Sequence, residues 1–175
     1  MKKIIKGIIC VILLSAVFTA FSGCSEKEVP TGFKVASDNT CDFDMFVPES
    51  WTVSLKSGTA AAYCSPTDPS SISVMPGELE YANSTVDDWW NNYKEDLGTV
   101  FSEFTLLSED EASLGGASGK CYTFTANLGE NEYRYEITAV IKHSRIYMMT
   151  FTSTDQLYES HTDTLASVKE YFKIH

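Results

Sequence analysis

The sequence has little positive charge. Its 175 residues include 13 lysines and arginines against 24 aspartates and glutamates. Residues 1–23 hold three of the lysines and no acidic residue, so the remaining 152 residues carry ten basic and 24 acidic side chains, a net charge of −14. Nucleic acids and anionic lipid headgroups are bound through clustered Lys and Arg, and both repel so acidic a chain. The composition therefore excludes a nucleic-acid partner.

Features of several other protein classes are also missing. The sequence has no internal repeat, no low-complexity tract and no series of long apolar runs, and 43% of its residues are apolar and 21% charged. This composition is typical of a folded domain and excludes disordered, collagen-like and multi-span membrane proteins. A length of about 150 residues is that of one domain, large enough to bury roughly two-thirds of its unfolded surface.

The cysteine spacing does not fit a zinc-binding motif. Cys41, Cys64 and Cys121 are separated by 23 and 57 residues, with none of the close Cys-x-x-Cys pairs that are typical of zinc sites. Cys121 lies in a strand pattern, where a small buried side chain is expected rather than a nucleophile. Two of the three thiols can form a disulfide outside the cytoplasm, and the sequence leaves open which two.

The histidines and the acidic clusters do not indicate a metal site or a catalytic site either. His143, His161 and His175 are scattered, and we interpret them as structural or solvated side chains. The acidic group at residues 109–111 lacks the order of a calcium-binding loop and is interpreted as a solvated surface. We predict no catalytic residue, no metal site and no cofactor.

A glycine-rich segment, residues 115–121, invites comparison with a phosphate-binding loop. Such a loop needs a further glycine upstream of its Gly-Lys pair and a Ser or Thr after it, but these positions hold Leu114 and Cys121. We predict instead a glycine turn that leads into a strand.

The first residues have the pattern of a secretory signal peptide. A lysine-rich start precedes an apolar run over residues 8–18, which is too short to span a bilayer. The run leads to Phe21-Ser22-Gly23-Cys24, which resembles the lipobox of bacterial lipoproteins: an apolar residue, two small residues and a cysteine. The alternative is an ordinary secreted protein whose apolar segment happens to end at a cysteine.

The lipobox resemblance implies a location for the protein. Lipoproteins carry acyl chains, such as palmitate, on the cysteine and are cut before it, so residues 1–23 are expected to be a lipoprotein signal peptide. Lipid on Cys24 implies anchoring to the cell membrane on its extracytoplasmic side. Residues 24–32 are polar and contain Pro30 and Gly32, so we expect a flexible tether there, followed by one domain over residues 33–175.

Several segments alternate polar and apolar residues with the period of a β-strand. These segments are residues 42–47, 51–54, 61–65 and 72–75 in the first half, and residues 120–126, 133–142 and 145–152 in the second. Only His143-Ser144 separates the last two, which predicts an antiparallel hairpin. Antiparallel pairing excludes a doubly wound nucleotide-binding sheet.

Two segments have a helical period instead. In the first, Ser84-Thr85 precedes an apolar stripe from Val86 to Leu97, and Gly98 is expected to lie just past the end of the helix. A second, C-terminal helix has an apolar face and could be capped by Asp155. That face is formed by Tyr158, His161, Leu165, Val168 and Phe172. The order of strands, helix, strands and helix predicts a layered α+β domain.

The segment Phe43-x-Met45-x-Val47-Pro48-x-x-Trp51 resembles the opening strand and turn of the Mog1/PsbP family, also described as PsbP C-terminal-like domains. Four later features are similar to that family in order and spacing: the Trp89-Trp90 helix, the strand after residues 114–117, the hairpin with Tyr147 and Phe151, and the helix ending Tyr171-Phe172. The resemblance covers about residues 40–173. It implies an antiparallel β-sheet sandwiched by helices, and no catalytic residue comes with it.

These features predict a lipoprotein that acts as a non-catalytic binding or assembly module at the cell surface or in the periplasm. Its protein partner is expected to present basic or apolar surface. A small-ligand-binding lipoprotein and an enzyme with an unrecognised site are the alternatives. The predicted contact residues are Trp89, Trp90, Arg134 and Arg145, because aromatic and Arg side chains most often anchor interfaces. The two tryptophans point about 100° apart, so one is expected to be partly exposed unless both pack at the edges of a wide apolar face.

Overall fold

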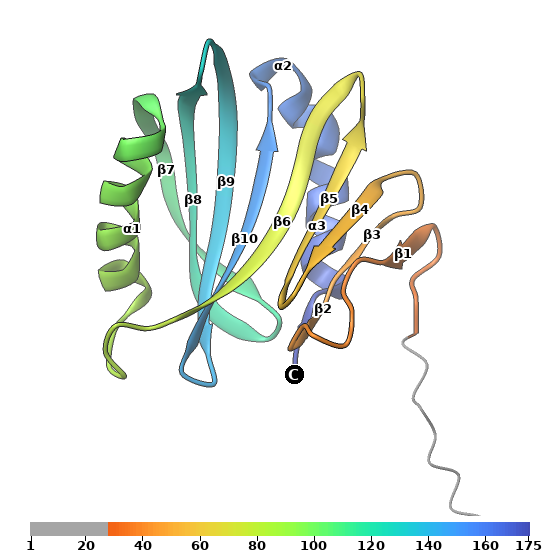
Figure 1. Cartoon of the computed structure of the whole chain (residues 1–175), viewed down its shortest axis with the longest axis horizontal. Coiled ribbons are helices and arrows are strands. Elements are labelled where there is room, and N and C mark those ends of the chain that lie inside the picture. The colour runs from red at the N-terminus through yellow and green to blue at the C-terminus, as the bar shows by residue number, and fades with distance from the viewer. Residues whose placement is uncertain (1–27) are drawn as a thin grey trace, which may run out of the picture.

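The computed structural model describes residues 28–175 and forms an antiparallel sheet with helices on both faces (Figure 1). The expected signal peptide and Cys24 lie outside these residues. The seven strands of the sheet lie in the order β4-β5-β6-β10-β9-β8-β7. This architecture confirms the prediction of an α+β domain with an antiparallel sheet sandwiched by helices.

The sheet contains β4 (Thr52–Lys56), β5 (Thr59–Ser65), β6 (Asp68–Glu78), β7 (Ser102–Leu114), β8 (Ala117–Leu128), β9 (Asn131–Lys142) and β10 (Arg145–Ser153). Two short antiparallel pairs lie outside it: β1 (Phe33–Val35) with β3 (Phe46–Pro48), and β2 (Phe43–Asp44) with β11 (Lys173–Ile174). The helical segments are α1 (Val86–Val100), α2 (Asp155–Tyr158), the 3₁₀ turn η1 (Glu159–His161) and α3 (Thr162–Tyr171).

The sheet consists of two consecutive meanders that meet in its middle. Strands β4 to β6 form the first meander and β7 to β10 the second, and β10 pairs with β6 to join them. The turn between β9 and β10 is the predicted hairpin. Its two residues, His143 and Ser144, both have positive φ, at 51° and 61°, as a tight two-residue turn between twisted strands requires.

Helix α1 begins where the sequence predicts. The Thr85 side chain accepts a hydrogen bond from the Asp88 N–H, and the Asp88 carboxylate accepts one from the Thr85 N–H, which forms a capping box. The expected end at Gly98 is wrong, because the helix continues to Val100. Gly98 does not adopt the left-handed conformation of a terminating glycine, and the Phe101 N–H donates to the Leu97 carbonyl.

The C-terminal helix is broken into three pieces, where the sequence predicts one continuous helix. Thr154 occupies the N-cap position of α2 and Asp155 is its first residue, so the expected cap at Asp155 is wrong. The predicted apolar face is nevertheless confirmed. All five of its residues are buried: Tyr158, His161, Leu165, Val168 and Phe172.

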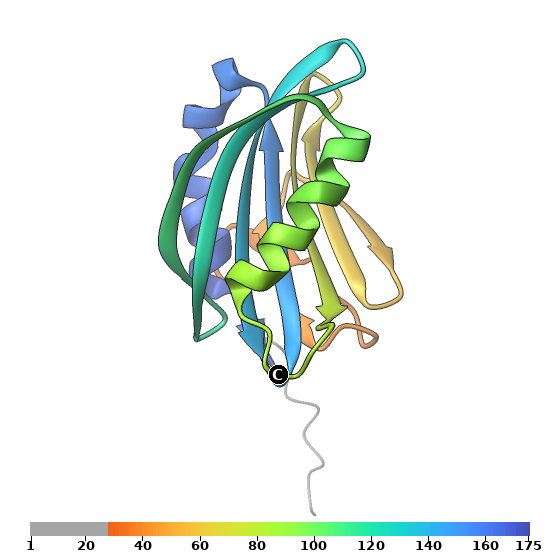
Figure 2. The same ribbon diagram turned by 90° about the vertical axis from the view of Figure 1, so that its left-hand side faces the viewer.

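Two hydrophobic cores lie on opposite faces of the sheet. Along β10, Tyr147, Met149 and Phe151 belong to the core beneath α3, whereas Ile146 and Met148 belong to the core beneath α1. This alternation follows from the two-residue period of a strand. Figure 2 shows the two helices on either side of the strands. The central strand β10 is thus buried from both sides.

Strand β7 has no counterpart among the predicted strands. Most of its residues are exposed, and its pairing with β8 is irregular after Ser102 and after Leu106. It is an edge strand without a buried face, so the apolar alternation that identifies the other strands is absent. The acidic group at residues 109–111 lies on this strand and is exposed, as expected for a solvated surface.

Candidate binding surface

Half of the sheet is uncovered on the α1 side. In Figure 1, which views this side, α1 lies at the left beside β7 and β8, while α3 lies behind β5 and β6. Side chains of β5 and β6 that point away from α3 are therefore exposed. Tyr63 is 49% exposed and Met75 is 47% exposed. We call the surface formed by Ala61, Tyr63, Ser73, Met75 and Thr150 the open face.

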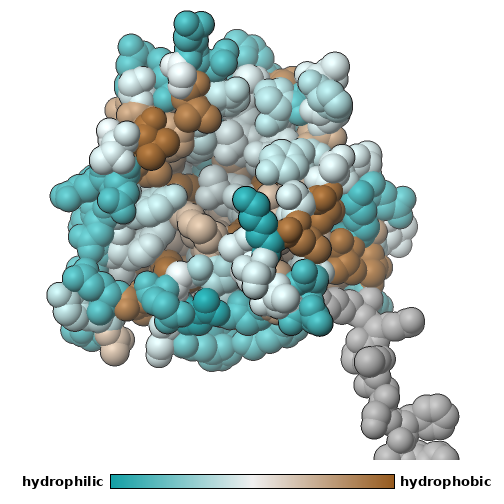
Figure 3. Space-filling view, in the orientation of Figure 1, coloured by the Kyte–Doolittle hydropathy of each residue, from teal (hydrophilic) through white to brown (hydrophobic). Residues whose placement is uncertain are grey.

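The open face is hollowed. A hollow of about 470 Å³ extends over β4, β5, β6 and β10, and Tyr93 of α1 contributes to its wall. The small side chains of Ala61, Ser73 and Thr150 give it a shallow floor, and Figure 3 shows a pale, recessed area near the centre of this view. Among the described residues that line it, Lys56 is the one charged side chain. The hollow therefore offers contact area and few groups for acid–base chemistry.

An acidic groove continues from the open face along α1. It has a volume of about 220 Å³ and shares Tyr93 with the hollow. The Tyr93 ring stacks on Trp89 with centroids 4.8 Å apart. Glu78, Glu80 and Asp96 also line this groove. Tyr93 and Trp89 therefore form an aromatic wall between the hollow and the acidic groove, and the groove side of this wall has a negatively charged rim.

The two predicted tryptophan contacts occupy different environments. Trp90 is 3% exposed, and its ring stacks on Tyr122 with centroids 3.9 Å apart. Trp89 is partly exposed and lines the acidic groove. Trp90 is thus part of the core and Trp89 is accessible, as expected if only one of the pair faces solvent. A role of Trp89 in partner contact stays a prediction.

The two predicted arginine contacts are held by neighbours within the chain. The Arg134 guanidinium lies over the Tyr158 ring, 3.8 Å from its centroid, and forms ion pairs with Asp155 and Glu159 at 3.6 and 3.4 Å. Arg145 forms ion pairs with Asp42 and, at 3.2 Å, with Glu78. Contact with a partner would compete with these interactions, and the structure does not bring the two arginines together with the tryptophans.

Glu136 is the centre of a polar network on the α3 side. Its carboxylate accepts hydrogen bonds from the Lys169 ammonium and the Tyr158 hydroxyl. Burial alone would raise the pKa of Glu136, but the Lys169 charge and these hydrogen bonds hold it below the ordinary value. Burial raises the pKa of the nearby Cys121 thiol, so this cysteine is not an activated nucleophile.

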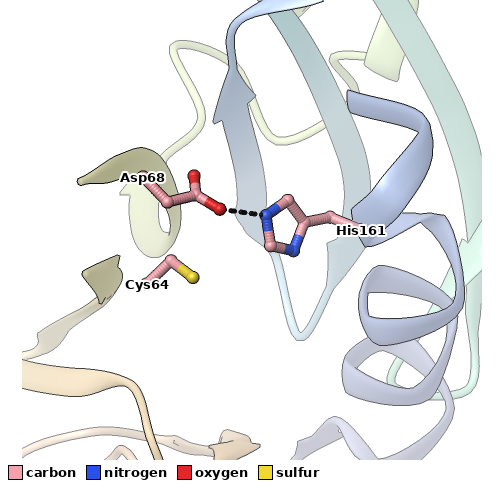
Figure 4. A group of neighbouring side chains, drawn as sticks. All are labelled: Cys64, Asp68 and His161. Carbon is pink, nitrogen blue, oxygen red and sulfur yellow. Dashed lines mark hydrogen bonds and ion pairs between the residues drawn. The ribbon is translucent and has the colours of Figure 1, made fainter. Parts of the chain in front are cut away.

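A hydrolase would need a histidine that activates a Ser or Cys. His161 Nε2 is hydrogen-bonded to Asp68 Oδ2 at 2.7 Å, so this ring nitrogen is directed at a carboxylate rather than at a hydroxyl or thiol. Cys64 lies beside this pair (Figure 4). Burial raises the pKa of the Cys64 thiol, and so do a hydrogen bond with Asp68 and the negative charge of the Asp68 carboxylate. A catalytic thiolate needs the opposite shift. The sequence gives no sign that these residues converge, because 93 residues separate Asp68 from His161.

The glycine-rich segment forms the predicted turn into a strand. Gly115 and Gly116 have positive φ, at 57° and 78°, and β8 begins at the next residue. Lys120 forms ion pairs with Asp87 and Glu109, each at 2.6 Å. This lysine therefore has carboxylate partners within the fold.

The described part of the expected tether lies against the domain. Residues 28–31 line a hollow of about 370 Å³ together with Phe46, Glu170, Tyr171 and Lys173. Among residues 28–175, no helix has the length and apolar character needed to cross a membrane. None of Cys41, Cys64 and Cys121 forms a disulfide in this part of the chain.

No protein-family model and no curated protein matches this sequence. Solved structures do match the fold. Mog1p of Saccharomyces cerevisiae, a Ran-binding protein, has a TM-score of 0.58 at 11% identity, covering 81% of this chain and 95% of its own. Cyanobacterial PsbP from Synechocystis has a TM-score of 0.57 at 9% identity, covering 88% of this chain and 99% of its own.

A Pseudomonas aeruginosa protein of unknown function is also similar, with a TM-score of 0.55 at 10% identity over 77% of this chain and 92% of its own. At such identities the likeness establishes the fold alone. The chain has the Mog1/PsbP-like fold that the sequence resemblance implies.

Proposed function

We propose that this protein is a lipid-anchored, extracytoplasmic binding module that holds a basic segment of a partner protein on its open face. The observation that carries the proposal is the exposed hollow beside α1, with its aromatic wall and acidic rim. Cys24 supplies the anchor, on the strength of the lipobox pattern at residues 21–24.

The shape and composition of the hollow favour a polypeptide over a small ligand. A small-molecule site encloses most of its ligand and fixes it with a few convergent polar groups. The hollow over the open face extends across four strands, and its floor is made of Ala, Ser and Thr side chains. Small side chains allow another chain to approach closely, and Tyr63, Met75 and Tyr93 provide the larger contact surfaces.

Charge specifies the kind of partner. The net charge of −14 beyond residue 23 and the rim residues Glu80 and Asp96 attract lysine and arginine side chains, whereas the third rim carboxylate, Glu78, is already paired with Arg145. Mog1p, which shares the fold, is a Ran-binding protein, so this architecture is able to present a protein-binding surface.

Site-specific photocrosslinking in intact cells tests the proposal. A photoreactive amino acid replaces Tyr63 or Met75 on the open face, and Leu128, which is exposed at the end of β8, serves as the control position. We expect a discrete crosslinked protein from the two open-face positions and none from Leu128. The captured protein should have a lysine- or arginine-rich segment at the crosslinked site.

A binding measurement with the captured protein then tests the chemistry. Ser73→Arg introduces bulk and positive charge into the hollow and should weaken binding at least about tenfold, whereas Ser113→Arg on the exposed part of β7 should not. Raising the salt concentration should also weaken binding, since rim charges are screened. An acidic partner, or equal affinity for both variants, would refute the proposed mode.

The anchor has its own test. Cys24→Ala should abolish acylation and remove the protein from the membrane fraction, because stable anchoring depends on buried acyl chains. A Ser25→Ala variant is the matched control and should remain in the membrane fraction. Retention of acyl label in the Cys24→Ala variant would contradict the lipoprotein assignment while leaving the open face to be tested separately.

A further inference from the structure

Cys64, Asp68 and His161 form a cluster at one end of the sheet (Figure 4). Cys64 lies near the end of β5, Asp68 begins β6, and His161 ends η1. One potential ligand atom from each residue, a sulfur, an oxygen and a nitrogen, lies within 4.8 Å of the other two. The cluster is on the α3 side of the sheet, so it is separate from the open face.

The surrounding structure holds each of the three side chains in place. The pairing of β5 with β6 is irregular at Cys64, which has no partner residue, and such a bulge redirects a side chain. The Ser70 N–H donates to Asp68 Oδ1 at 2.9 Å, which leaves Oδ2 directed at His161. The His161 side chain is 11% exposed, and its imidazole packs edge-on against the rings of Trp51 and Phe151.

We propose that Cys64 Sγ, Asp68 Oδ2 and His161 Nε2 bind a zinc ion. Tetrahedral zinc with bonds of about 2.0–2.3 Å places its ligand atoms about 3.3–3.6 Å apart. The Asp68–His161 contact of 2.7 Å must lengthen by less than an ångström, and Cys64 Sγ, which lies within 4.8 Å of the other two ligand atoms, must approach them by at most about 1.3 Å. Small side-chain rotations are sufficient, since the residues already share one site.

The mixture of donor atoms selects the metal. Calcium and magnesium prefer oxygen ligands throughout, whereas zinc accepts thiolate, imidazole and carboxylate together. On binding, Cys64 releases its thiol proton to solvent as the sulfur–zinc bond forms, and His161 binds through its neutral nitrogen. Three protein ligands leave the fourth position for water or for a donor from another molecule.

Cobalt substitution tests the site directly, because Co²⁺ occupies zinc sites and reports its ligands by absorption. The full-length protein, purified in detergent, is titrated with Co²⁺ and then with Zn²⁺. We expect thiolate-to-cobalt charge-transfer absorption in the near ultraviolet, visible bands typical of a tetrahedral site, and loss of both as zinc displaces cobalt.

The control variants separate a metal site from a structural contact. Cys64→Ser keeps the Asp68–His161 hydrogen bond, so the fold should survive while the charge-transfer band disappears and zinc binding weakens at least about tenfold. Cys41→Ser, which removes another partly buried thiol outside the cluster, should leave both signals unchanged. Asp68→Asn should weaken zinc binding while the charge-transfer band remains when cobalt is in excess.

The proposal is overturned if Co²⁺ produces no thiolate band in the wild-type protein, or if the band is equally strong in Cys64→Ser. Ser73→Arg on the open face provides the link to function: it should reduce partner binding and leave the cobalt spectrum unchanged. The two proposals can therefore fail independently.

Discussion

The two faces of the sheet are built from the same strands, but different elements cover them and to different extents. On the α3 side, β4, β5, β6 and β10 are covered by α3 and the short N-terminal strands, in a core that includes Trp51, Ile72, Phe151 and Leu165. On the α1 side, helix α1 packs on β8 and β9 through Trp90 and Leu97 and leaves β5 and β6 exposed.

The difference shows that coverage, rather than strand sequence alone, decides which surface is available for binding. Alternate residues of β6 enter the α3 core, as Ile72 and Val74 do, while Ser73 and Met75, which alternate with them, line a solvent-exposed hollow. The same strand therefore contributes to stability on one side and to the proposed binding surface on the other. Substitutions on the two sides should have correspondingly different effects.

The largest loss of stability is expected from Trp90→Ala. Removing this ring leaves a cavity against Tyr122 beneath α1 and should lower the free energy of unfolding by about 3–5 kcal/mol. Urea unfolding followed by circular dichroism measures the change. Trp89→Ala is the control and should cost clearly less, because Trp89 is partly exposed. Equal losses would contradict the assignment of Trp90 alone to the core.

On the opposite face, Leu165→Ala should lower the free energy of unfolding by about 2–5 kcal/mol, because Leu165 is buried between α3 and the sheet. Glu170→Ala, an exposed change on the same helix, should shift it by less than about 0.5 kcal/mol. The same urea unfolding measurement applies. A loss below about 1 kcal/mol for Leu165→Ala would show that α3 contributes little to that core.

Glu136→Gln tests the polar network and its dependence on pH. The folded-state pKa of Glu136 lies below its ordinary value of 4.5, so its ionised form stabilises the fold fully above that pH and progressively less below it. At pH 7 the variant should be less stable by about 1–3 kcal/mol, and this difference should shrink as the pH falls below 4.5. Urea unfolding of the wild type and of Glu136→Gln, at pH 7 and at a pH below 4.5, measures this difference in stability.

The exposed Glu132→Gln on the same strand should show no such dependence. A difference between wild type and Glu136→Gln that grows in acid would mean that the network stabilises the protonated carboxyl instead.

Met75→Ala should have the smallest effect on stability, within about 0.5 kcal/mol, because Met75 is 47% exposed. Its effect should appear in partner binding instead, as a reduced yield of crosslink from the Tyr63 position. A stability loss above about 1 kcal/mol would mean that the open face is part of the folding core rather than a free surface.

Local signals in the sequence predict much of the fold. The capping residue Thr85, the hairpin turn at His143-Ser144 and the buried face of α3 all depend on neighbours within a few residues, where periodicity and capping rules apply. The polar edge strand β7 has no such signal, because neither of its faces is consistently buried.

The candidate sites depend on contacts that no local pattern contains. The open face exists because α1 packs over β8 and β9 rather than over β5 and β6, which the alternation in those strands does not indicate. Cys64 and Asp68 meet His161 only after the C-terminal helical segments fold back on the sheet. The period of the sequence identifies which residues share a face, but not what covers that face.

The pairing of β6 with β10 also has a consequence for how the protein folds. It places Met75 opposite Met148, 73 residues later, whereas neighbouring strands within each meander are linked by short turns. Closing so long a loop costs chain entropy before any contact compensates for it. We therefore expect the two meanders to form early and their junction late, so that the amides that bond β6 to β10 gain protection last during refolding, although these strands lie at the centre of the native sheet.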